Sequence, residues 1–127
     1  MATTRNLVLD WAQYTAAAVA PGVFIPAGGW ILTGGVTGAR AWGEFRAMVL
    51  NFQAQPAIQV ANDVRAPGAV QLLGTLSGAN GVFDPVTAVA IGSSASSRFL
   101  RPGWAVSLSQ AGALGSGSLY GIIELQY

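Results

Sequence analysis

The sequence predicts an all-β fold, a sandwich or a barrel, in a single domain that spans residues 1–127. Turn-forming residues recur at intervals of roughly a dozen residues, as at Pro21-Gly22, Gly34-Gly35, Pro67-Gly68 and Asn80-Gly81. Several segments between these turns alternate apolar with small or polar residues. Short strands joined by tight turns produce this rhythm, so we expect strands along most of the chain.

The first twenty residues fit two descriptions. Leu7, Trp11, Tyr14 and Ala18 lie at helical spacing, and an alanine run favours a helix. However, Leu7, Leu9 and Trp11 also alternate as in a strand. We favour a strand or extended segment over a helix here.

Later segments are predicted as strands because they alternate or are rich in β-forming residues. Trp104, Val106 and Leu108 share one face of a strand and are expected to lie in the core. Further turns are expected at Pro56, Pro102-Gly103, 92–97 and 112–117. The expected strands are 42–54, apolar on both faces, then 57–60, 70–75, 86–91, 104–109 and 119–127.

Residues 11–39 carry no charge, which raises the question of a membrane span. Pro21, Pro26 and six glycines would interrupt a spanning helix near its centre. Asp10 and the short alanine-rich run after it also make a poor signal peptide. We therefore predict buried strands with turns, and no membrane partner.

The composition argues against an enzyme. The chain has no histidine, cysteine or lysine, so the usual nucleophile–base pairs and cysteine zinc sites are missing. No spacing among the carboxylates singles out a catalytic or metal-binding pair, and Glu44–Arg46 and Asp63–Arg65 look like surface neighbours on strands. We predict no catalytic residue, no cofactor and no metal. The five carboxylates are Asp10, Glu44, Asp63, Asp84 and Glu124.

Charge is scarce as well as scattered. Charged residues make up 9% of the chain and the net charge is +1, whereas soluble proteins average roughly 25% charged residues. The six arginines form no dense basic stripe, so we predict no nucleic-acid binding. A surface this poor in charge favours association, and we expect identical neighbours or a larger scaffold to cover it.

Five residues are the candidate contacts of such an assembly. Trp30 follows a predicted loop at Pro26-Ala-Gly-Gly, so its ring is expected at a rim or beneath a neighbour. Arg98 and Arg101 bracket Phe99-Leu100 and can pair with a carboxylate of another copy or extend over an apolar edge. The full set is Trp30, Trp42, Arg98, Arg101 and Tyr120.

Residues 99–127, FLRPGWAVSLSQAGALGSGSLYGIIELQY, resemble the last two strands of trimeric jelly rolls of the C1q and tumour-necrosis-factor type. In that family a Leu-x-x-Gly-x-x-Val-x-Leu strand leads through a glycine-rich loop to a final strand of Ser-aromatic-x-Gly-apolar pattern. Similar jelly rolls occur in phage and virus decoration, spike and fibre-head proteins, and Ile25–Trp30 resembles a bend common in such proteins. The matching residues are Leu100, Gly103, Val106, Leu108, Ser118, Tyr120, Gly121 and Ile123.

The resemblance covers about a quarter of the chain, and the first two thirds depart from it. It implies a jelly-roll-like antiparallel β-sandwich of about eight strands, assembled as a homotrimer with a structural role. We therefore expect a virion component, most simply a phage capsid decoration (cement) protein or a spike or fibre head, bound to a larger protein shell after assembly in the host cytoplasm. The alternative is a carbohydrate-binding module or lectin that binds a glycan on exposed tryptophans.

Overall fold

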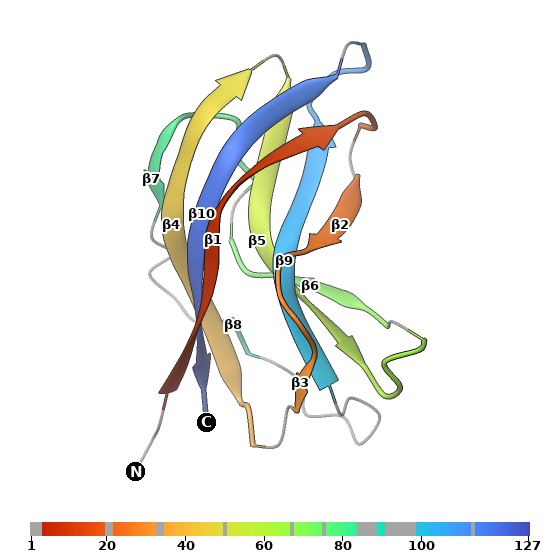
Figure 1. The fold of residues 1–127 in the computed structure, drawn as a ribbon, viewed down its shortest axis with the longest axis vertical. Coiled ribbons are helices and arrows are strands. Elements are labelled where there is room, and N and C mark those ends of the chain that lie inside the picture. Colours follow the sequence, from red (N-terminus) through yellow and green to blue (C-terminus); the bar gives the residue numbers. More distant parts are fainter. Residues whose placement is uncertain are drawn as a thin grey trace.

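The structure, a computed structural model, describes residues 4–19, 22–32, 35–49, 51–66, 68–74, 76–83, 89–90, 99–112 and 114–127. These residues form ten strands in two five-stranded antiparallel sheets that pack face to face (Figure 1). In sheet A the strand order is β1 (Thr4–Ala16), β10 (Gly115–Gln126), β4 (Gly38–Val49) and β7 (Gly81–Phe83), and β8 (Val89–Ala90) also pairs with β4.

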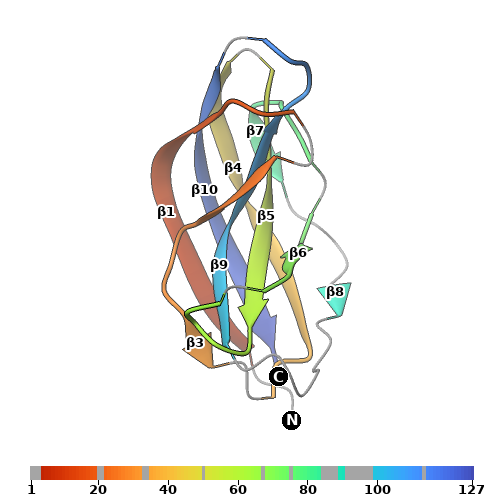
Figure 2. The same cartoon turned by 90° about the vertical axis from the view of Figure 1, so that its right-hand side faces the viewer.

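Sheet B has the order β2 (Val23–Pro26), β9 (Phe99–Leu108), β5 (Phe52–Ala61) and β6 (Val70–Leu72), and β3 (Ile31–Leu32) also pairs with β9. The chain crosses repeatedly from one sheet to the other (Figure 2), so strands adjacent in a sheet are mostly distant in sequence. Eight strands interleaved in this way make a jelly roll. The predicted jelly-roll-like sandwich of about eight strands is confirmed, with β3 and β8 as two-residue additions.

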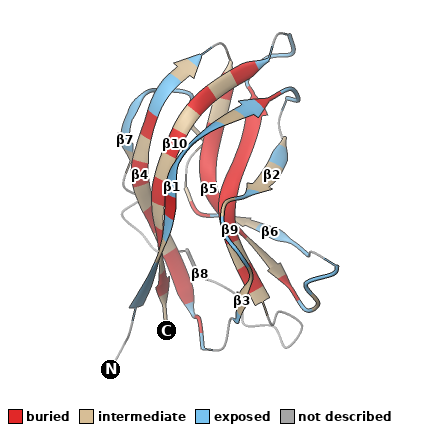
Figure 3. Ribbon diagram, in the orientation of Figure 1, coloured by how far each residue is buried: buried red, intermediate tan, exposed pale blue. Residues whose placement is uncertain are grey.

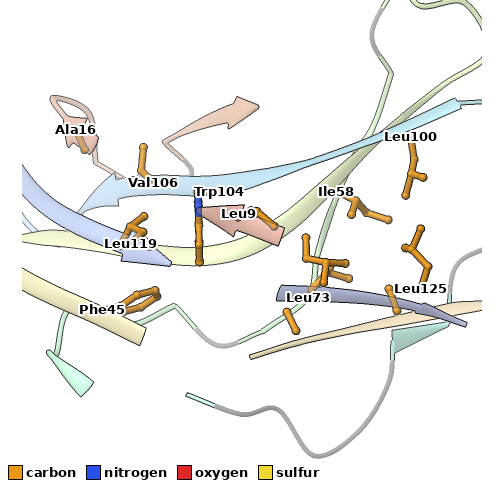
Figure 4. Packing of buried hydrophobic residues seen from close by; sticks show 14 of the residues in the cluster. Leu9, Ala16, Phe45, Ile58, Leu73, Leu100, Trp104, Val106, Leu119 and Leu125 are labelled. Carbon is orange, nitrogen blue, oxygen red and sulfur yellow. The ribbon is translucent and has the colours of Figure 1, made fainter. Parts of the chain in front are cut away.

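The centre of the core is the indole ring of Trp104, which lies between the two sheets (Figure 4). Trp104 is fully buried, and its ring contacts Phe45 at 5.7 Å and Phe83 at 6.1 Å between centroids. On the opposite sheet a Cβ atom at Gly121 would lie 2.9 Å from Cη2 of this indole, so a side chain there would collide with it. Val106 and Leu108 are also buried, which confirms the predicted inward face of this strand.

The two central strands of sheet B are buried on both faces. Figure 3 shows β5 and β9 as almost continuously buried, whereas β1, β2, β6 and β7 carry most of the exposed positions. On the outer face Ala57 and Ala105 are covered by their neighbours. Apolar residues on both faces predicted a doubly covered strand at 42–54. The structure has such strands at β5 and β9 instead.

The prediction of one strand over 42–54 is wrong. β4 ends at Val49 in sheet A, and β5 begins at Phe52 in sheet B, with Asn51 in the turn between them. Phe45 and Phe52 both point into the core, but from opposite sheets. The apolar pattern of 42–54 therefore comes from the inward faces of two strands in different sheets, not from two covered faces of one strand.

Pro56 and Pro102 lie inside strands rather than at the predicted turns. Pro56 pairs with Trp104, and its carbonyl accepts a hydrogen bond from the Leu73 amide at 2.9 Å, just beyond the end of β6. Pro102 accepts one from the Ala27 amide at 2.9 Å, in the gap between β2 and β3. Because N and C=O of one residue face the same side of an antiparallel strand, each proline nitrogen points where no strand continues the pairing.

The glycine-rich stretch 112–117 was predicted as a loop, but its second half belongs to β10. A Cβ atom at Gly115 would lie 2.9 Å from Leu108 and from Phe52, and one at Gly117 would overlap Met48. Glycine is therefore required where β10 crosses this part of the core. The connection from β9 to β10 spans residues 109–114.

Residues 4–16 form a strand rather than a helix, and strands occur at 70–72 and within 57–60, 104–109 and 119–127. Of the predicted strand 86–91 only β8 is described, and the predicted turn at 92–97 lies outside the described residues. No helix long and apolar enough to cross a bilayer occurs in the part of the chain that the structure describes.

The inward face of β9 is tested by Leu108→Asp. An unpaired carboxylate between the sheets costs several kcal/mol, which is comparable with the about 5–15 kcal/mol that stabilises a typical domain. We expect the variant to lose its cooperative thermal unfolding transition, measured by circular dichroism. Ser109→Asp, at the next and exposed position, is the control and should melt like the parent; a normal melt for Leu108→Asp would show that this face is not inward.

Burial of Tyr14 beside Trp104 predicts a loss of stability in alkali. Desolvation raises the pKa of the Tyr14 phenol above its ordinary value, partly opposed by the neighbouring Trp104 side chain, although the indole N–H has no partner at hydrogen-bond geometry among the described residues. The unfolded chain then loses this proton first, so stability is complete below about pH 10 and falls as pH rises through the folded pKa. Urea unfolding from pH 7 to 11 should show a smaller alkaline loss for Tyr14→Phe, and equal slopes would contradict the burial effect.

Candidate interaction surface

The structure separates the predicted contact residues into two groups. Trp42 and Tyr120 lie on neighbouring strands of sheet A, on its outer face. Trp30 and Arg101 contact each other at the outer face of sheet B, with the guanidinium 4.5 Å from the ring centroid. Arg98 lies outside the described residues.

Two β-bulges shape the outer face of sheet A. In β1 Leu9 pairs with Gly121 and Ala12 with Leu119, so Asp10 and Trp11 together oppose Tyr120. This extra residue breaks the predicted alternation of Leu7, Leu9 and Trp11: Leu9 is buried, whereas Trp11 is exposed and stacks on Tyr120 at 5.5 Å with an interplanar angle of 28°. The bulge thus redirects an aromatic side chain to the surface.

A second bulge lies in β4, on the other side of β10. Arg46 pairs with Ser118 and Val49 with Ser116, which leaves one extra residue in β4. Ala47, in this interval, has a φ of 53°, in the left-handed region that non-glycine residues rarely adopt. The bulge sits where β4 leaves the regular ladder, next to Arg46.

Arg46 links strands across the outer face. Its guanidinium lies 4.8 Å from the centroid of Trp11 on β1, and its Nε donates to the Glu44 carboxylate on β4. The ion pair is exposed and contributes little stability by itself, whereas the cation–π contact contributes about 0.5–1 kcal/mol at such a site. The predicted neighbour relation of Glu44 and Arg46 is confirmed.

Arg40 makes a similar arrangement further along β4. Its Nε donates to Glu124 on β10 at 3.0 Å, and its guanidinium lies 5.4 Å from the ring of Trp42. Asp63 and Arg65 form the other predicted pair, and the Arg65 guanidinium lowers the pKa of the Asp63 carboxyl. Three of the four described carboxylates are therefore paired with an arginine. Within the described ranges no group of three or more metal-ligating side chains occurs.

A shallow hollow of about 270 Å³ opens between β4, β7 and β10 on this face. We call it the sheet A hollow. It combines aromatic rings with one carboxylate, and Val82 at its rim is 79% exposed. Its lining residues are Trp42, Gly43, Glu44, Val82, Phe83 and Tyr120.

The outer face of sheet B is different in character. Arg101 donates from Nε and Nη2 to the Gln59 side-chain oxygen at 2.9 and 2.7 Å, and lies 6.0 Å from the ring of Phe24 as well as against Trp30. The Phe24 ring covers Gly103, where a Cβ atom would be 2.7 Å from Cζ. Trp30 is therefore half-buried by its own chain rather than free at a rim.

Phe24 connects this cluster to a second hollow of about 280 Å³. None of the described residues that line it has a polar side chain. We call the cluster and the hollow together the sheet B surface: Trp30, Arg101, Gly22, Val23, Phe24, Val70, Leu72 and Ala105.

The composition predicted contacts through tryptophan and arginine, but it did not place Trp11, Arg40, Glu44, Arg46 and Val82 together on the outer face of sheet A. Glu44–Arg46 was the one available signal, because residues two apart on a strand share a face. The contact between Trp11 and Arg46 depends on strands that are remote in sequence.

No family model matches the chain, and no curated protein matches it in sequence. The fold is similar to solved structures of a virus capsid protein. The infectious bursal disease virus VP2 subviral particle aligns over 98% of this chain and 32% of that chain, with a TM-score of 0.64 and 14% identity. Structures of that virus's derived T=1 particles (98% and 31% covered, TM-score 0.62, 17% identity) and of its Gx strain (100% and 32% covered, TM-score 0.60, 17% identity) are similar as well.

This chain spans about a third of the length of those capsid chains. The identity is low, so the likeness establishes the fold. That fold is the β-sandwich of viral capsid chains, and the likeness does not support the C1q and tumour-necrosis-factor type in particular.

The left-handed residue in the β4 bulge gives a stability prediction. Ala47→Gly removes the Cβ contact that disfavours a φ of 53°, so it should stabilise the fold by about 1 kcal/mol. Ala41→Gly, at a buried position in the same strand, should destabilise it. Urea unfolding of both variants measures the difference, and a loss of stability in Ala47→Gly would show that the bulge is not strained.

Proposed function

We propose that this chain is a structural component of a virus particle, in which it associates with copies of itself and with a larger protein shell. The observation that carries the proposal is the sheet B surface of the jelly roll: an apolar hollow whose described lining residues have no polar side chain, bordered by a tryptophan–arginine contact. Trp and Arg are the residues most enriched at energetically important interface positions. The likeness of the fold to capsid proteins supports the same role.

Association removes this apolar surface from water. Each Å² of apolar surface buried contributes roughly 25 cal/mol before the costs of association are subtracted. The Arg101 guanidinium already lies against aromatic rings. Because a guanidinium is weakly hydrated, its desolvation on association costs less free energy than desolvation of an exposed lysine ammonium would. A neighbouring copy that covers Phe24 and Leu72 therefore buries apolar area at little electrostatic cost.

More specifically, we propose that the chain is a phage capsid decoration (cement) protein or a spike or fibre head. The chain acts as a single domain and as a homotrimer, is located in the virion, and is assembled in the host cytoplasm. A closed ring of three copies leaves no sheet B surface uncovered. Arg98 is proposed to contribute next to Arg101 at the same contact.

The proposal assigns no enzymatic activity, cofactor, metal, nucleic acid or membrane to the chain. Each of the carboxylates Glu44, Asp63 and Glu124 is paired with an arginine, which does not favour a carboxylate pair of the glycosidase kind. A carbohydrate-binding module or lectin is the alternative whole function. It leaves the sheet B surface unexplained, because the lining residues that the structure describes there offer no polar side chain to a sugar hydroxyl.

Native mass spectrometry at micromolar concentration tests the assembly. The parent chain should appear as a trimer or a larger closed ring. Leu72→Glu places a charge in the sheet B hollow at a position 48% exposed in the protomer, so it should give folded monomers. Trp30→Ala should weaken the assembly while the protomer stays folded.

Leu114→Glu is the matched control, because Leu114 is 63% exposed in the connection between β9 and β10 and lies outside the sheet B surface. It should leave the assembly unchanged. A parent chain that is monomeric throughout would remove the main support for the proposed function. An equal loss of assembly in the control would show that the contact does not use the sheet B surface.

A further inference from the structure

The sheet A hollow differs from the sheet B surface in having both aromatic rings and polar groups, and this difference bears on what it can bind. It lies on the opposite side of the sandwich, between β4, β7 and β10. Its volume of about 270 Å³ suits a ligand of one small ring rather than a protein segment. The assembly proposed for sheet B would leave it open.

Two of the three aromatic rings that line the hollow, those of Trp42 and Tyr120, are held by neighbouring side chains. Trp42 has the Arg40 guanidinium at 5.4 Å, and Arg40 is in turn fixed by Glu124. Tyr120 is stacked on Trp11, which carries Arg46 at 4.8 Å. A ligand that packs on the remaining ring surface loses less side-chain entropy on binding, because these rings are already ordered.

Polar groups at the edge of the hollow have unused hydrogen-bonding capacity. Glu44 uses one carboxylate oxygen for Arg46, and its other oxygen, Oε1, has no partner within the described residues. Arg46 donates from Nε only, which leaves the N–H groups of both terminal nitrogens without a hydrogen-bond acceptor in the described part of the chain. Glu44 thus places an acceptor in the hollow beside aromatic surface. Arg46 is not one of the lining residues, but its ion pair with Glu44 holds its donors next to that acceptor.

A neutral sugar ring matches this combination. A pyranose has a face of C–H bonds that packs against an aromatic ring, and its hydroxyls both donate and accept hydrogen bonds. The charges of Glu44 and Arg46 offset each other, so neither an anion nor a cation gains a net electrostatic attraction. An entirely apolar ligand would leave the free Glu44 oxygen and the Arg46 N–H groups unpaired.

We infer that the sheet A hollow binds a neutral hexose of a glycan, with Trp42 and Tyr120 as the stacking surface and Glu44 and Arg46 as the hydroxyl partners. The site goes beyond the proposed structural function and uses the other face of the molecule. A surface component of a particle that binds sugar in this way could attach the particle to a glycan.

The test uses the full chain labelled with 5-fluorotryptophan, whose four tryptophans give separate ¹⁹F NMR signals that single Trp→Phe variants assign. The probes are methyl glycosides of the common neutral hexoses, added up to about 100 mM, since one ring held by a shallow site is expected to bind with a millimolar Kd. The Trp42 signal should shift saturably with at least one of them, and the Trp30 and Trp104 signals should not.

Trp42→Ala should weaken sugar binding at least about tenfold, followed by the remaining Trp11 signal or by saturation-transfer NMR on the sugar. Trp30→Ala is the matched control, because it removes another arginine-backed tryptophan from the other face, and it should leave the Kd unchanged. If Trp42→Ala does not fold, Val82→Glu at the exposed rim should block the hollow instead, with thermal unfolding as the check of its fold.

No saturable shift with any of the glycosides overturns the inference, as does a shift confined to the Trp30 signal or an equal loss in Trp30→Ala. Native mass spectra of the same samples separate this outcome from failure of the proposed function. Intact trimers whose ¹⁹F signals do not respond to sugar would contradict only the hexose site. Monomers whose Trp42 signal responds to sugar would contradict only the proposed assembly.

Discussion

The packing of Trp104 against Gly121 is the constraint on which both surfaces depend. The indole needs a glycine opposite it, so Gly121 must face inward. Because side chains alternate along a strand, Tyr120 and Ile122 must then face outward. On β9 the inward position of Trp104 places Arg101 on the other face in the same way. A slip of one residue in either strand would bury the polar or aromatic surface groups and expose the core, so the core register determines the surface register.

The same packing extends to β4. Gly43 pairs with Gly121, and a Cβ atom at Gly43 would overlap the backbone of Tyr120. Two glycines side by side let sheet A approach Trp104 closely and leave Trp42 and Glu44 on the outer face. The hollow on sheet A therefore originates from the tryptophan in the interior: small residues are required inside, and large residues on both sides of them project outward.

Most of the described arginines make contacts with aromatic rings. Arg40, Arg46 and Arg101 each lie over an aromatic ring, and the first two also form ion pairs. A guanidinium is planar and weakly hydrated, which suits it to this position better than a lysine ammonium. The accessible surface of 6678 Å² is close to the about 6,300 Å² that scaling gives for a monomer of 13.0 kDa. The protomer thus exposes about as much surface as a typical monomer of its mass.

The sequence by itself determined the all-β class, the inward face of Trp104, Val106 and Leu108, and the Glu44–Arg46 pair, because these follow from turn residues and from spacing along one strand. Only the tertiary structure decided that Pro56 and Pro102 lie within strands, since each depends on a neighbouring strand that ends beside the proline. The same holds for the contacts of Trp11 with Tyr120 and Arg46, which two bulges and three strands bring together. Such contacts join residues more than thirty positions apart, and local periodicity contains no information about which remote strands become neighbours.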